Sequence, residues 1–274
     1  MRLLWSVTLG LGGAVVLLNA SLYLWRAVRQ YRSGASSGTG DALGIADAVW
    51  AFTQECAATA AVILLIPIGW VLPRCRSGAG HRGPLMLLHG WGLNRGSLWL
   101  LQHRLVRDGW SPVGCFDYRS LAADVGAAAA RLGPAVDRLA RAAPDCPVAL
   151  VGHSLGGLVL RYYLQHSPAP HVRRIVTLGT PHQGSELARL LPAARARLAP
   201  GSALLHTLNA ADRVRQQFDV IAIRSAFDAI VLPPENAEYP GAFTVSVSGV
   251  GHNALLFSSK IYHLLAENLS APLC

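Results

Sequence analysis

The sequence predicts an α/β domain with a mostly parallel central sheet and helices on both faces, preceded by a transmembrane helical hairpin. Two observations lead to this prediction. Residues 1–73 are very apolar and carry few charges. After them, short apolar runs typical of buried strands alternate with longer segments of helical spacing, and this alternation indicates parallel strands joined by helices.

Two long apolar runs lie near the N-terminus. Residues 3–25 contain no charged residue, and residues 48–72 have Glu55 as their one charge. Each run is long enough to cross a hydrocarbon core of about 30 Å as a helix. Between them, residues 33–41 are rich in Ser and Gly and suit a turn. We therefore expect residues 1–76 to form a membrane anchor, with Glu55 near the lipid headgroups.

A cleavable signal peptide is the alternative for the first run, because Arg2 precedes it and Ala20 could serve a signal protease. The apolar stretch continues to Trp25, beyond such a cut, which favours a retained anchor. Arginines flank the two sides of the hairpin in nearly equal number, so charge does not decide its orientation. The sequence predicts attachment to a membrane, taken to be the bacterial inner membrane, and leaves the side of the following domain open.

The remainder of the chain, residues 85–274 after a Gly/Arg-rich linker at 77–84, forms the predicted globular domain. Its apolar runs predict strands, and its segments with apolar residues at helical intervals predict helices. The expected strands are 85–88, 113–116, 148–152, 174–178, 219–223 and 243–247, and the expected helices are 97–108, one kinked or two separate helices within 120–143, 155–166 and about 258–268.

The segment Gly152-His153-Ser154-Leu155-Gly156 connects the strand at 148–152 directly to a helix. A G-x-S-x-G sequence in this context is typical of a nucleophile elbow, whose sharp turn raises the serine hydroxyl above the sheet. It also places the serine at a helix N-terminus, where backbone N–H groups stabilise negative charge. The alternative is a Gly/Ser turn without chemistry. We predict that Ser154 is a nucleophile.

A serine nucleophile needs a base, and the base needs an acid that orients it. Asp228 follows the strand at 219–223, and His252 follows the strand at 243–247 through a glycine-flanked loop. Both positions are at the carboxyl ends of strands, where catalytic loops gather in open α/β sheets. Asp228 could instead be a turn residue or helix cap, and His252 is one of ten histidines. The order serine, acid, histidine favours these two, and His182 is a poorer base candidate because it precedes the acid.

The segment 89–92, His-Gly-Trp-Gly, follows the first strand and can supply part of an oxyanion hole. The backbone N–H groups of Trp91 and Leu155 are the predicted donors. Four residues around this loop and the elbow are candidates for the substrate pocket, the two histidines among them being structural braces or pocket walls: His89, Gly90, Leu93 and His153.

Several of these motifs together resemble the bacterial triacylglycerol lipase and esterase branch of the α/β-hydrolase superfamily. They are HGWG, GHSLGG, LGTPHQG at 178–184, SAFDAIV and GVGHNALLF at 249–257, and the resemblance extends from about Gly83 to Leu269. It implies the α/β-hydrolase fold, the three catalysts named above, an acyl-enzyme intermediate, and neither a metal nor an organic cofactor. This sequence differs from the secreted members of that branch in its membrane hairpin. The insertion at 186–202 is short and basic, which leaves little room for a large lid over the site.

The sequence thus predicts a serine hydrolase, a lipase or carboxylesterase, that cleaves an ester or lipid substrate at a membrane. A thioesterase, an acyltransferase or a polyester depolymerase would use the same triad. Haloalkane chemistry is disfavoured because it would use an aspartate in place of Ser154. Two non-enzymatic alternatives are an inactive membrane scaffold and a helper for another lipase.

The net charge of +9 does not indicate nucleic-acid binding. The arginines that carry it are dispersed over many predicted elements, without a basic helix interleaved with aromatic residues. A basic surface close to anionic lipid headgroups is the more natural use of this charge. The sequence leaves the oligomeric state open.

Overall fold

The computed structural model describes residues 2–33, 44–210 and 213–269. Its centre is a seven-stranded sheet in the order β1-β3-β2-β4-β5-β6-β7, in which the edge strand β1 is antiparallel and the others are parallel. The strands are β1 (Cys75–Arg76), β2 (Leu85–Leu88), β3 (Val113–Phe116), β4 (Val148–His153), β5 (Val172–Leu178), β6 (Asp219–Ser225) and β7 (Phe243–Val247). The predicted fold class, an α/β protein with a mostly parallel sheet, is confirmed.

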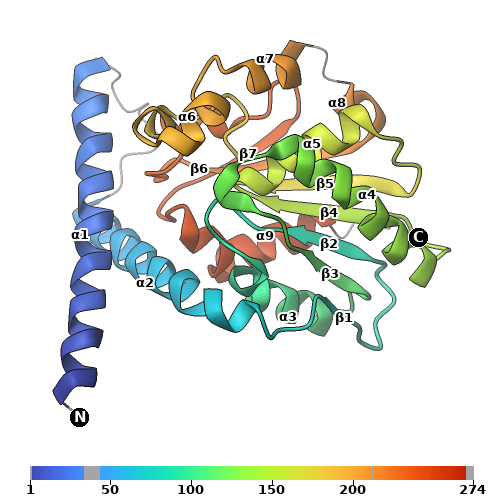
Figure 1. Ribbon diagram of the computed structural model, residues 1–274, viewed down its shortest axis with the longest axis horizontal. Helices are drawn as coiled ribbons and strands as arrows, with labels where there is room; N and C mark the ends of the chain where they lie inside the picture. The colour runs from blue at the N-terminus through green and yellow to red at the C-terminus, as the bar shows by residue number, and fades with distance from the viewer. Residues whose placement is uncertain (1, 34–43, 211–212, 270–274) are drawn as a thin grey trace.

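Helices cover both faces of the sheet and extend away from it at the N-terminus (Figure 1). The α-helices are α1 (Arg2–Ser33), α2 (Ile45–Gly69), α3 (Trp99–Arg107), α4 (Val125–Ala142), α5 (Leu155–His166), α6 (Pro192–Leu198), α7 (Ala203–Ala210), α8 (Val214–Gln217) and α9 (Ser259–Leu269). Short 3-10 helices are η1 (Arg95–Leu98), η2 (Ser120–Ala122), η3 (Glu186–Leu190), η4 (Pro234–Ala237) and η5 (Asn253–Leu256).

The sheet separates two hydrophobic cores because successive side chains of a strand point to opposite faces. In β2, Met86 and Leu88 join the core formed with α4, α5 and the segments from α6 to α8. Leu85 and Leu87 join the core formed with α3, α9 and α2. All four residues of β2 are buried, as expected for a strand covered on both faces.

The predicted strands are present, with ends that differ by up to two residues. The short strand β1 was not predicted, because two residues are too few to show an alternating pattern. The alanine-rich segment 120–143, expected as one kinked helix or two, forms η2 and then a single helix, α4, that continues through Pro134. Asp124 stabilises the start of α4, since its Oδ1 accepts a hydrogen bond from the N–H of Ala127 at 3.0 Å.

Both N-terminal helices are long and apolar enough to cross a membrane, by length and composition. α1 continues past the predicted end at residue 25 to Ser33, because the arginines in its last turns contact the domain instead of ending the helix. Arg26 Nη2 donates to the carbonyl of Ala226 at 2.6 Å, and Arg29 lies 3.3 Å from Glu186. Figure 1 shows α1 along one side of the domain, with its N-terminal end projecting beyond it.

α2 packs along the domain for most of its length. One face is buried, including Ala51, Glu55, Ala58 and Val62, and two of these residues belong to the second core. Near the other end of α2, Asn94 Nδ2 donates to the carbonyl of Ile66 at 2.8 Å. Glu55, which we expected near the headgroups, is therefore buried against the domain. α2 is at once a candidate membrane span and a component of the hydrophobic core.

Candidate active site

Ser154 forms a sharp turn between β4 and α5. Its φ of 53° and ψ of −123° are rare for a residue other than glycine, and its N–H donates to the carbonyl of Leu178 at 2.8 Å. A Cβ at Gly152 would lie 2.6 Å from the nitrogen of Gly157, and a Cβ at Gly156 would lie 2.7 Å from the carbonyl oxygen of Leu88. The strand and helix can approach this closely only because both positions are glycine.

Asp228 and His252 form a buried hydrogen-bonded pair beside the carboxyl ends of β6 and β7. His252 Nδ1 and Asp228 Oδ2 are 2.7 Å apart. Asp228 is fully buried, and its Oδ1 accepts hydrogen bonds from the N–H groups of Ile230 at 2.7 Å and Val231 at 2.9 Å. These bonds fix the carboxylate, so Nδ1 of His252 is the donor to Oδ2 of Asp228.

The surroundings of His252 favour its protonated form. Burial by itself would lower the pKa of His252, but the charge of Asp228, its hydrogen bond and the charge of Glu55 outweigh burial and raise this pKa. His153 lies beside it, with its Nε2 3.1 Å from the carbonyl oxygen of His252. Burial, followed by the positive charge of His252, holds the pKa of His153 well below its ordinary value. His153 is therefore a neutral neighbour of His252.

Gly179 follows β5 and lies beside the pair that His252 forms with Asp228. A Cβ at Gly179 would lie 3.2 Å from Nδ1 of His252 and 3.4 Å from Oδ2 of Asp228, and the preceding residue, Leu178, accepts the hydrogen bond from Ser154. All three candidate catalytic residues thus gather at one edge of the sheet. Within the part of the chain that the structure describes, Ser154 Oγ makes no hydrogen bond to His252.

The loop predicted to complete the oxyanion hole lies against the nucleophile. A Cβ at Gly90 would lie 3.0 Å from the Cβ of Ser154, and Trp91 is the next residue. The Trp91 indole Nε1 donates a hydrogen bond to the carbonyl of Leu121 at 3.1 Å. Leu155 is the first residue of α5, where a backbone N–H has no partner within the helix. The positions of Trp91 and Leu155 are compatible with the predicted donor roles, which stay predictions.

Of the residues predicted to line the substrate pocket, His89 and His153 are buried and brace the loops. The His89 ring stacks on Tyr118 at 4.4 Å, and the Tyr118 hydroxyl donates to the His89 carbonyl. These contacts match the bracing role, one of the two that the sequence left open. Gly90 lies beside Ser154, Leu93 is partly buried, and their contact with a substrate stays a prediction.

His182, the alternative base, is held by contacts with buried side chains. Its Nε2 lies 3.0 Å from Thr177 Oγ1 and its Nδ1 lies 3.4 Å from Arg161. Burial, followed by the charge of Arg161, holds the pKa of His182 well below its ordinary value. These contacts occupy both ring nitrogens, which agrees with the preference for His252.

Sequence reasoning missed the residues that join the N-terminal helices to the site. Glu55 Oε1 and Oε2 accept hydrogen bonds from the N–H groups of Asn253 and Ala254, each at 2.9 Å. Tyr23 donates to the carbonyl of Phe227 at 3.0 Å. The one available signal was that Glu55 is a lone charge in an apolar run, which we assigned to the headgroup region.

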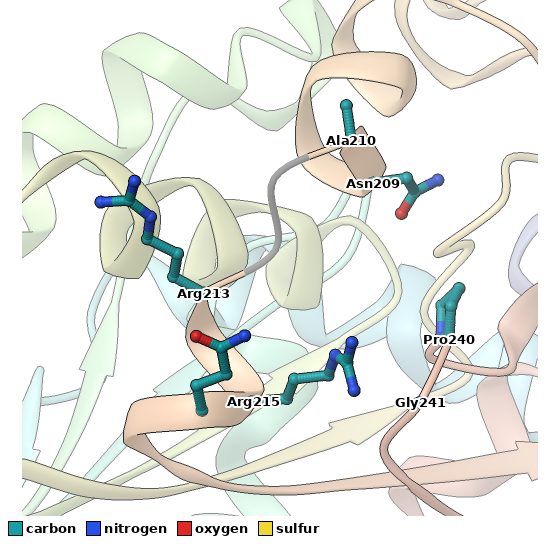
Figure 2. Close-up of a pocket in the computed structure, with 7 residues that line it drawn as sticks. Asn209, Ala210, Arg213, Arg215, Pro240 and Gly241 are labelled. Carbon is teal, nitrogen blue, oxygen red and sulfur yellow. The ribbon is translucent and has the colours of Figure 1, made fainter.

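A separate open pocket of about 530 Å³ lies at α7, α8 and the loop before β7 (Figure 2). It is lined by Asn209, Ala210, Arg213, Arg215, Gln216, Pro240 and Gly241, and so by none of the candidate catalytic residues. Among the described residues, no group of three or more His, Cys, Asp or Glu side chains could hold a metal ion.

Comparisons with known proteins find one family model and several solved structures that are similar to this chain. The model of the palmitoyl protein thioesterase family matches residues 121–238, a range that includes Ser154 and Asp228 but ends before His252. The structure is similar to a Bacillus licheniformis lipase in its mature form, with 18% sequence identity, a TM-score of 0.56, and coverage of 71% of this chain and 94% of that one.

Two further structures show the same similarity. A Paleococcus ferrophilus monoacylglycerol lipase has 18% identity and a TM-score of 0.54, covering 71% of this chain and 97% of that one. An Exiguobacterium antarcticum esterase has 16% identity and a TM-score of 0.51, covering 72% and 94%. With the sheet order and the elbow at Ser154, these similarities show that the chain has the α/β-hydrolase fold.

Proposed function

We propose that this protein is a serine hydrolase that cleaves carboxylic esters, with Ser154 as nucleophile, His252 as base and Asp228 as the acid that orients the base. The observation that carries the proposal is the 2.7 Å contact between His252 Nδ1 and Asp228 Oδ2, at the same sheet edge as the strained elbow of Ser154. A positive φ at a non-glycine residue is retained where the surrounding structure enforces it, and such strain is concentrated at active sites.

In the proposed acylation step, Ser154 Oγ attacks the acyl carbonyl carbon while Nε2 of His252 accepts the hydroxyl proton. The N–H groups of Leu155 and Trp91 donate to the oxyanion of the tetrahedral intermediate. The carbon–oxygen bond to the alcohol then breaks, and the alcohol leaves with the proton from His252. This step requires Oγ and Nε2 to come into contact when a substrate binds, and such hydrogen bonds are often long before that.

In the proposed deacylation step, a water molecule attacks the acyl-enzyme. His252 accepts a proton from the water and returns it to Ser154 Oγ as the carboxylic acid departs. Asp228 stabilises the imidazolium in both steps without taking its proton. The two N–H donors on Oδ1 keep Oδ2 directed at His252, so the ring holds the tautomer that leaves Nε2 free to accept.

A thioesterase is the second candidate, because the family model that matches residues 121–238 is that of a palmitoyl protein thioesterase. The same three side chains would serve, with a thiolate as the leaving group. Matched oxygen esters and thioesters of graded acyl length would separate the two activities. A ratio of kcat/KM values that favours the thioesters throughout would assign the thioesterase function.

We also propose that α1 and the outer face of α2 attach the enzyme to a membrane. Large apolar side chains are exposed along both helices: Leu11, Val16, Leu17, Leu18 and Leu24 on α1, and Val49, Trp50, Ile63, Leu64 and Ile68 on α2. Because the opposite face of α2 is packed on the domain, attachment would hold the domain against the lipid surface. The bacterial inner membrane as the location stays a prediction, and the side of the domain is open.

Labelling with a fluorophosphonate probe tests the proposed nucleophile. The wild-type chain in detergent should be labelled and should hydrolyse short acyl esters, whereas Ser154→Ala should lose labelling and lose hydrolysis by about 10⁴-fold or more. Ser167→Ala, at the other end of α5, is the matched control and should behave as the wild type. Labelling that persists in Ser154→Ala would overturn the assignment.

A further inference from the structure

The carboxylate of Glu55 reaches from α2 into the loop that carries His252. Oε1 accepts from the Asn253 N–H at 2.9 Å and from Asn253 Nδ2 at 3.1 Å, and Oε2 accepts from the Ala254 N–H at 2.9 Å. Asn253 Nδ2 also donates to Thr59 Oγ1 on the next turn of α2, at 3.1 Å. Glu55 is only 2% exposed, so these donors take the place of water around a buried carboxylate.

The residues on both sides of His252 in the loop contribute to the contact with Glu55. His252 is the N-cap residue of η5, and its own side chain does not cap the helix. The N–H groups of the two residues that follow it are the ones bonded to Glu55, which therefore takes the place of a capping side chain. On the preceding side, a Cβ at Gly251 would lie 2.4 Å from Oε2 of Glu55, so only glycine lets the loop approach this carboxylate.

α1 contacts the loop that carries Asp228 in a similar way. The Tyr23 hydroxyl donates to the carbonyl of Phe227 at 3.0 Å, and Arg26 Nη2 donates to the carbonyl of Ala226 at 2.6 Å. The centres of the Phe227 and Tyr23 rings are 4.7 Å apart, and the Arg26 guanidinium lies over the Phe227 ring at 5.5 Å from its centre. Tyr23 also contacts Phe52 of α2 at 5.6 Å, which joins the two supports.

We propose that Glu55 of α2 is a positioning residue that holds His252 in register with Asp228 and Ser154, and that Tyr23 and Arg26 of α1 support the loop that carries Asp228. This inference rests on the proposed function. It explains the one charge within the apolar run at 48–72: a buried carboxylate is stabilised only where donors are fixed around it, and here the donors are the backbone of the loop that carries His252. An apolar residue at this position would leave those N–H groups without acceptors.

The test compares Glu55→Ala, Glu55→Gln and Val62→Ala in the full chain in detergent micelles. Val62 is the control, since it is an equally buried residue of α2 that belongs to the second core. Glu55→Ala should lower kcat for a short acyl ester at least tenfold, with KM changed less than twofold, because the reacting groups are misaligned while substrate contacts remain. Glu55→Gln retains one acceptor oxygen and should recover part of the loss, and Val62→Ala should keep kcat within twofold.

The pH profile supplies a readout that a purely structural role would not change. The charged or titratable groups that face His252 are Asp228 from the β6 loop, Glu55 from α2 and His153 from the end of β4. Because the ionised form of Glu55 favours the protonated form of His252, Glu55→Gln, which is neutral at every pH, should move the acid limb of kcat/KM to lower pH. Val62→Ala should leave that limb unchanged. If Glu55→Ala does not fold, the acid limb of the pH profile of Glu55→Gln still tests the proposal.

The outcomes separate this inference from the proposed function. If Ser154→Ala abolishes hydrolysis while both Glu55 variants keep the wild-type kcat and acid limb, the triad stands and the positioning role is refuted. Hydrolysis that persists in Ser154→Ala would instead refute the proposed function itself. Equal losses in Glu55→Ala and Val62→Ala, with an unmoved limb in Glu55→Gln, would also overturn the inference, because α2 would then contribute only stability.

Discussion

Replacing Asp228 by asparagine tests the proposed relay most directly, because the surroundings of this residue determine the result. In the wild type, Oδ1 accepts two backbone N–H bonds, at 2.7 and 2.9 Å, and Oδ2 faces His252 Nδ1 at 2.7 Å. Asparagine has one oxygen, and two fixed donors hold that oxygen at the Oδ1 position. Its NH₂ group then faces Nδ1, which must become an acceptor, so the proton moves to Nε2.

A histidine protonated at Nε2 while neutral cannot accept the proton of Ser154, and Asp228→Asn also removes the charge that stabilises the imidazolium. The same tautomer reversal lowers kcat by about 10⁴-fold in a Ser-His-Asp triad. At 1.36 kcal/mol for each factor of ten, this loss is about 5.4 kcal/mol in activation free energy. The fold should be kept, because both backbone bonds to the side chain remain.

Steady-state hydrolysis of a short acyl ester and the rate of fluorophosphonate labelling both measure this loss. Asp219→Asn is the matched control, since Asp219 is an exposed carboxylate at the start of β6 that bonds Arg174 at 3.3 Å. It should change kcat less than twofold. An Asp228→Asn variant that melts as the wild type does but keeps kcat within tenfold would refute the relay that we describe.

Three further outcomes are expected. Because His252 must be neutral to act as base and its pKa is raised, kcat/KM should fall as the pH drops through a value above the ordinary 6.5 or so, as a pH–rate profile would record. Gly156→Ala should lower the free energy of unfolding by about 1–3 kcal/mol in a urea titration, since the new methyl would meet the Leu88 carbonyl at 2.7 Å. A chain lacking residues 2–14 should bind lipid vesicles more weakly in a flotation assay but hydrolyse esters normally in detergent, because Tyr23 and Arg26 remain to support the site.

Each expectation has an outcome that contradicts it. An acid limb centred well below 6.5 would show that the raised pKa of His252 does not control the rate. A wild-type unfolding curve for Gly156→Ala would mean that the elbow can relax around a methyl group. Undiminished vesicle binding after removal of residues 2–14 would assign attachment to α2 or to the domain surface.

The sequence predicted the sheet well because its strands are apolar runs bounded by turn residues, a pattern that depends on burial alone. The predicted strand at 148–152 and helix at 155–166 differ from the structure by at most one residue. The pair of Asp228 and His252 was also predictable, since both follow strands in the expected order. The lack of a hydrogen bond between Ser154 Oγ and His252 among the described residues was not predictable, because loop conformation decides it and spacing along the chain does not.

The location of α2 could not be predicted from its composition. An apolar helix that faces lipid and one that faces a protein core have the same residue types, because both environments exclude water. Glu55 was the single informative residue, and a glutamate in an apolar run is equally compatible with a headgroup region and with a buried partner. Only the structure identifies the partner, the backbone at residues 253 and 254.

The packing of α2 has a practical consequence for protein production. Trimming an apolar leader is the usual way to obtain a soluble enzyme, but a chain that starts after residue 72 would expose the hollow that Ala58 and Val62 fill and would lose the carboxylate beside His252. Replacing exposed side chains of α2, such as Trp50 and Leu64, by polar residues would improve solubility and leave the buried face of the helix unchanged. The apolar N-terminal segment of this chain is therefore also part of the folded domain.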